Sequence, residues 1–74
     1  SNYVFVSKKA PKKVIEFLRE RLATLVHNEA FLKDFLKATS TYDCAVYDWK
    51  KCEEEIANYR KQIASVESML REAE

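Results

Sequence analysis

Apolar residues recur with heptad spacing through the second half of the chain. Alternating steps of three and four residues from Tyr42 reach only apolar or aromatic positions. These positions are Tyr42, Ala45, Trp49, Cys52, Ile56, Tyr59, Ile63, Val66, Leu70 and Ala73. A repeat of about 3.5 residues keeps one side of a helix turned toward a neighbouring helix along its length. The pattern predicts a helix over residues 42–73 that packs against a second helix.

The first half of the chain carries a heptad strip of its own. Its members are Ile15, Leu18, Leu22, Leu25, Glu29, Leu32 and Leu36. Pro11 marks the expected start, because proline is tolerated in the first turn of a helix, where its missing N–H has no partner to lose. We therefore predict a helix over residues 10–38.

Hydroxyl residues separate the two strips. Residues 39–41 read Thr-Ser-Thr, and Asp43 follows Ser40 by three positions in a pattern that resembles a capping box. We expect a turn at 39–41 with the second helix starting at 42. Two helices joined by so short a connection must run antiparallel.

Folding the chain about residue 40 places the two strips side by side. Leu25 then lies near Ile56, Leu22 near Tyr59 and Leu18 near Ile63, with Trp49 also inside the seam. The predicted fold is all-α, an antiparallel two-helix hairpin of the coiled-coil kind. Glu29 interrupts its strip, which indicates either a polar residue that fixes the register or a rotation of the helix that exposes it.

The N-terminal residues 1–9 are expected to form a short extended arm. Tyr3–Val6 is a β-favouring run, which either packs over helical surface or pairs as a strand with a second copy. Residues 1–74 are read as a single domain. The chain has no initiator Met and begins Ser-Asn, which resembles the remnant of protease cleavage, so we expect a piece of a longer protein.

Aromatic side chains remain uncovered when the hairpin seam is complete. The predicted partner interface consists of Phe17, Phe31, Phe35 and Tyr47. Burying a Phe contributes about 1.5 to 3 kcal/mol, so leaving these residues in water would forgo much of a small domain's stability. A second hairpin, giving a four-helix bundle, is the simplest cover, and another helical protein is the other candidate partner.

Composition narrows the classes of function. The chain contains no glycine and one proline, which argues against an all-β fold and a glycine-rich phosphate loop. The net charge is +1, but residues 1–38 carry +4 and residues 39–74 carry −3. The halves either attract each other within the hairpin or offer a basic surface to an acidic partner. No apolar run approaches the length of a membrane span.

Cysteine usage points to a reducing compartment. Cys44 and Cys52 lie about 12 Å apart along one predicted helix, too far to bond within a chain. We therefore expect a cytoplasmic or otherwise intracellular protein, with a bridge between Cys52 residues open to a parallel dimer. With His27 these thiols lack the clustered spacing of a zinc site, and no nucleophile has an evident base. We predict no catalytic residue, metal, cofactor or small-molecule substrate.

A basic cluster precedes and opens the first helix. It comprises Lys8, Lys9, Lys12 and Lys13. Such a cluster can contact phosphates, with Tyr3 and Phe5 nearby as stacking groups. The leading prediction is a non-catalytic oligomerisation or protein-interaction module, and the alternative is a small nucleic-acid-binding regulator that uses the basic arm.

Overall fold

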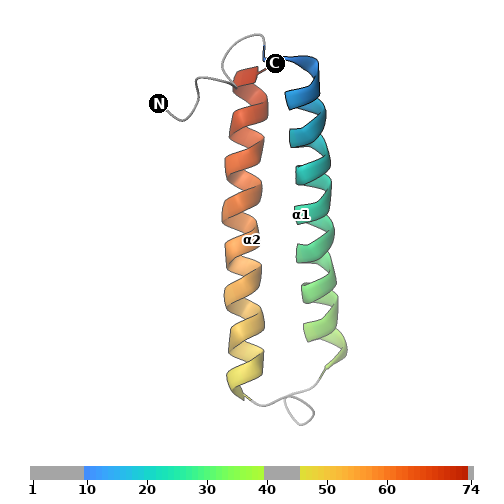
Figure 1. The fold of residues 1–74 in the computed structure, drawn as a ribbon. Coiled ribbons are helices and arrows are strands. Elements are labelled where there is room, and N and C mark those ends of the chain that lie inside the picture. The colour runs from blue at the N-terminus through green and yellow to red at the C-terminus, as the bar shows by residue number, and fades with distance from the viewer. Residues whose placement is uncertain (1–9, 40–45, 74) are drawn as a thin grey trace.

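The computed structural model describes residues 10–39 and 46–73, and within them the chain is helical. Helix α1 spans Lys12–Ala38 and helix α2 spans Val46–Ala73. They lie side by side and run in opposite directions (Figure 1). The predicted two-helix hairpin is confirmed, and no strand occurs in either described range. The expected arm, Lys8, Lys9, Cys44 and the Ser40 cap lie outside these residues.

Helix α1 begins at Lys12, two residues later than the predicted start at residue 10. Pro11 has φ −56° and ψ 146°, so it is extended rather than helical. Its carbonyl accepts the backbone N–H groups of Val14 at 2.9 Å and Ile15 at 3.2 Å. Pro11 is therefore the N-cap, and Lys12 is the first helical residue. At the other end, Thr39 is extended and donates its N–H to the Phe35 carbonyl at 3.0 Å, which closes the last turn.

The core lies between the helices, toward the beginning of α1 and the end of α2. Leu25 is its most enclosed residue, with 1% of its surface exposed. The buried cluster consists of Leu18, Leu25, Val66 and Leu70. Ile15, Leu22, Tyr59 and Ile63 pack against it. These residues all belong to the two heptad strips, so periodicity alone identified the packed faces.

Individual contacts across the seam join residues of the two strips. Leu25 and Tyr59 line one depression, and Leu18 and Val66 line one groove. Ile63 packs against the cluster that contains Leu18 and Leu25, and Ile56 is itself buried.

Polar side chains bridge the helices on either side of the core. Arg60 Nε donates to Glu29 Oε2 at 2.8 Å, and the side chain of Glu29 is 18% exposed. On the other flank Arg21 donates to Gln62 Oε1 at 3.0 Å. Glu29 therefore sits in the seam with its charge paired, the arrangement expected of a residue that disfavours other registers. Its partner on α2 is Arg60.

Candidate functional site

The most exposed apolar side chains of the described residues lie on α1. Phe17 and Phe31 are each 65% exposed and Phe35 is 42% exposed. Phe17 directly precedes the buried Leu18, so it projects about 100° around the helix from the packed face. Phe31 and Phe35 are one turn apart and project from the same flank, since Phe35 follows Phe17 by five whole turns. We call this flank, with its three phenylalanines, the aromatic face.

An apolar groove adjoins Phe17 at the beginning of α1. It has a volume of about 420 Å³, and its surface is almost entirely apolar. Its walls are Lys13, Val14, Phe17, Leu18, Arg21, Val66 and Met69. Val14 and Met69 also pack against the core, although neither belongs to the two heptad strips. They lie on the border between the core and the aromatic face, so the groove is a shallow extension of the core that is open to solvent.

The middle of the same flank is polar. A second depression, of about 310 Å³, lies beside Leu25 and Tyr59. Its other walls are Arg21, Asn28, Glu55, Asn58 and Gln62. Along α1 the aromatic face therefore consists of an apolar groove, a polar centre and two protruding phenylalanine rings. The rings were predicted from the sequence, but the groove was not. The groove depends on how Val66 and Met69 of α2 pack against α1.

Three further residues were predicted at the interface or in the seam: Tyr47, Trp49 and Tyr59. Tyr47 lies in α2, but the side chain of this residue lies outside what the structure describes. Tyr59 packs against the core, and Trp49 is half-buried. Val26 is 46% exposed, but it lies nine residues after Phe17, on the opposite side of α1. It therefore does not contribute to the aromatic face.

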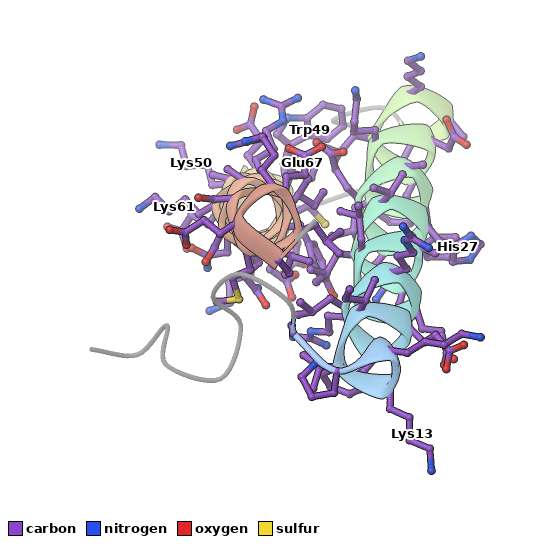
Figure 2. All side chains as sticks on the ribbon, turned by 90° about the horizontal axis from the view of Figure 1, so that it is seen from above. Lys13, His27, Trp49, Lys50, Lys61 and Glu67 are labelled. Carbon is purple, nitrogen blue, oxygen red and sulfur yellow. The ribbon has the colours of Figure 1, made fainter. Side chains whose placement is uncertain are left out.

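The first turn of α1 begins with two basic residues and contains no acidic residue to balance their charge. These residues, Lys12 and Lys13, are both exposed. Positive charge at this end of a helix opposes the helix dipole. Figure 2 shows Lys13 and His27 projecting from α1 away from α2, while Lys50 and Lys61 project from the far side of α2. Lys13 thus stands clear of the hairpin seam, and Lys12 is exposed beside it, so an anion can reach both.

The described residues offer little for metal or thiol chemistry. No group of three or more His, Cys, Asp or Glu side chains among residues 10–39 and 46–73 is arranged to hold a metal ion. Cys52 is a half-buried thiol in α2. Within the same ranges neither helix combines the length and the apolar character needed to cross a membrane. No family model matches the chain, and no curated protein or solved structure matches it at a significant level.

Proposed function

We propose that this hairpin is a non-catalytic, intracellular interaction module that associates through the aromatic face of α1, most simply with a second copy to form a four-helix bundle. The observation that supports the proposal is the exposure of Phe17, Phe31 and Phe35 on a single flank of one helix. Single exposed apolar residues are normal on protein surfaces, but three exposed phenylalanines on one flank of a helix, one of them lining an apolar groove, are typical of an interface.

The area of the exposed rings sets the scale of the association energy. Covering the exposed part of a phenylalanine ring at Phe17 or Phe31 removes about 130 Å² of apolar surface, or about 3 kcal/mol. Two copies that cover half of each of the three rings remove on the order of 350 Å², or about 9 kcal/mol, which is of the same order as the association cost of about 4 to 15 kcal/mol. A hairpin of this size also gains from oligomerisation, because small single cores supply little stability.

The test substitutes one exposed ring and compares it with a matched control. Phe31→Gln removes a ring of the aromatic face and keeps good helix propensity. Val26→Gln places the same side chain at an exposed apolar position on the other side of α1. If half of each exposed ring is buried, two rings per dimer contribute about 3 kcal/mol, so Phe31→Gln should raise the dimer Kd on the order of 100-fold in sedimentation equilibrium.

The control decides the interpretation. Val26→Gln is expected to leave the Kd within about threefold of the unsubstituted chain, a change of less than 1 kcal/mol. Equal weakening by both variants would show that association is a general property of exposed apolar surface. No change with Phe31→Gln, at unchanged helix content, would contradict an interface on the aromatic face.

A second candidate function is supported by Lys12 and Lys13, which are exposed at an end of α1 that lacks acidic residues. Together with Lys8 and Lys9 they would contact the phosphates of a nucleic acid. Binding should then weaken steeply with salt and be lost when all four lysines are replaced by alanine. Salt-insensitive binding, or none in a filter-binding titration, would dispose of this function.

A further inference from the structure

The aromatic face of α1 follows a heptad repeat separate from the one that faces α2. Steps of three and four residues along it reach Val14, Phe17, Arg21, Thr24, Asn28, Phe31, Phe35 and Ala38. Its apolar members lie at the two ends of α1, and its polar members lie in the middle. A helix in a bundle contacts two neighbours and needs two such strips. The strip that contains Leu18 and Leu25 faces α2, and the second strip borders that seam, with Val14 packed against the core and Arg21 bonded to Gln62.

The order of residues in this strip reads nearly the same in both directions. Phe17 lies seven residues before Thr24, and Phe31 lies seven residues after it. If two copies of α1 run antiparallel with Thr24 at the two-fold axis, apolar positions face apolar ones and polar positions face polar ones. The facing pairs are Val14 with Phe35, Phe17 with Phe31, Arg21 with Asn28, and Thr24 with Thr24. A two-fold interface requires this kind of self-complementary surface.

A parallel alignment of the same strips is unfavourable. It would set Arg21 against Arg21 at the centre of the seam and pair like charges in a partly desolvated position. In the antiparallel alignment each Arg21 instead faces Asn28, whose amide oxygen accepts hydrogen bonds. Arg21 has donor groups to spare after its bond to Gln62, because a guanidinium carries several N–H donors.

Shape supports the same arrangement. Phe17 lines the apolar groove, and Phe31 and Phe35 are exposed rings on the other side of Thr24. Phe17 and Phe31 each lie seven residues from Thr24, about 10 Å at the rise of a helix, and Phe35 lies one turn beyond Phe31. A two-fold axis at Thr24 therefore brings the rings of each copy toward the groove of the other.

Polar and charged residues flank the strip on its outer side. The flanking residues directly precede Val14, Arg21, Asn28 and Phe35 of the strip. They are Lys13, Glu20, His27 and Asp34. In an antiparallel pair of helices these flanking positions face one another across the axis, so Lys13 meets Asp34 and Glu20 meets His27. Lys13 and His27 project from α1 away from α2 (Figure 2), where a second copy can reach them. Lys13 and Asp34 carry opposite charges, and the ring N–H of His27 is a donor for the Glu20 carboxylate.

We propose that the partner is a second copy of this chain, bound antiparallel through α1 with the two-fold axis at Thr24. The inference rests on the proposed function, since it names the occupant and orientation of the same aromatic face. Each copy inserts Phe31 and Phe35 beside the groove of the other, and Lys13 pairs with Asp34 at both ends.

Distances between two spin labels test the orientation in the full chain. The background is Cys44→Ser with Cys52→Ser, and a nitroxide is attached to Ala23→Cys or to Lys12→Cys, both exposed positions outside the strip. The proposal predicts a short distance for labels at 23, about 20 to 30 Å, because packed helices approach within about 10 Å and each label stands on the outer side of its helix. Labels at 12 should be about 36 Å apart along the axis, since twelve residues separate each from Thr24.

The alternative outcomes are distinct. Short distances at both positions would establish a parallel pair, and long distances at both would remove α1 from the interface; either overturns the proposal while the chain remains a dimer. A monomer in parallel sedimentation runs would overturn the proposed function as well. Circular dichroism of each labelled chain checks that the hairpin is intact.

Charge exchange provides a measurement without labels. A Lys13→Glu chain and an Asp34→Lys chain each place like charges at both ends of their own dimer, and their mixed dimer restores opposite charges at both ends. Equimolar mixing should give more than the statistical half of heterodimer in native mass spectrometry. A heterodimer fraction of half or less would contradict the antiparallel register.

Discussion

Replacing Leu25 by alanine probes the packing that holds the hairpin together. Leu25 is 1% exposed and lies in the buried cluster with Leu18, Val66 and Leu70. A buried Leu→Ala change costs about 2 to 5 kcal/mol, the smallest values occurring where the surroundings can collapse onto the cavity. Two helices without a third layer can move together, so we expect a loss of about 2.5 to 3 kcal/mol.

That loss is large for this chain. At about 0.05 to 0.15 kcal/mol per residue, a domain of 74 residues has a free energy of unfolding of about 4 to 11 kcal/mol. Urea denaturation followed by the helical circular dichroism signal measures the change. All variants must be compared at one protein concentration, because dimerisation makes the apparent stability depend on concentration.

The neighbouring residue supplies the control. Val26 is 46% exposed, so Val26→Ala should change the free energy of unfolding by no more than about 0.5 kcal/mol. Its loss of apolar contact is offset by the higher helix propensity of alanine. If Leu25→Ala cost less than about 1 kcal/mol, or if the two variants cost the same, the seam described for α1 would be wrong.

Two further predictions concern charges. A double-mutant cycle with Glu29→Gln and Arg60→Gln should give a coupling below about 1 kcal/mol that shrinks in high salt, because Arg60 is 61% exposed to screening solvent; a larger, salt-independent coupling would contradict this reasoning. Lys12→Glu should raise the free energy of unfolding by about 0.3 to 1 kcal/mol at low salt, because it places a negative charge at the positive end of α1, and destabilisation in the same urea titration would refute the reasoning.

Periodicity was sufficient to predict the hairpin and its packed faces. Leu18, Leu25, Val66 and Leu70 were expected in the seam and form the buried cluster, because a heptad repeat determines which side of a helix is apolar. The exposure of Phe17 and Phe31 follows from the same reasoning, since these residues lie outside the strip that faces α2.

The register and its side-chain partners could not be obtained in this way. A slip of one turn leaves the same residues on the packed face, so the repeat alone does not determine which residue of α2 meets a given residue of α1. The pairing of Glu29 with Arg60 depends on the reach of a long side chain, which no spacing rule records. The groove beside Phe17 could not be predicted either, because it depends on the position of Met69 relative to Val14.

The central claim is that a second copy covers the aromatic face of α1. Static light scattering on the unsubstituted chain, from low to high micromolar concentration, tests it most directly. The account predicts a mass that rises with concentration toward about twice the 8.7 kDa of one chain, as expected for a dimer with a micromolar or lower Kd. A mass of 8.7 kDa across the whole range, with the helix content intact, would contradict it.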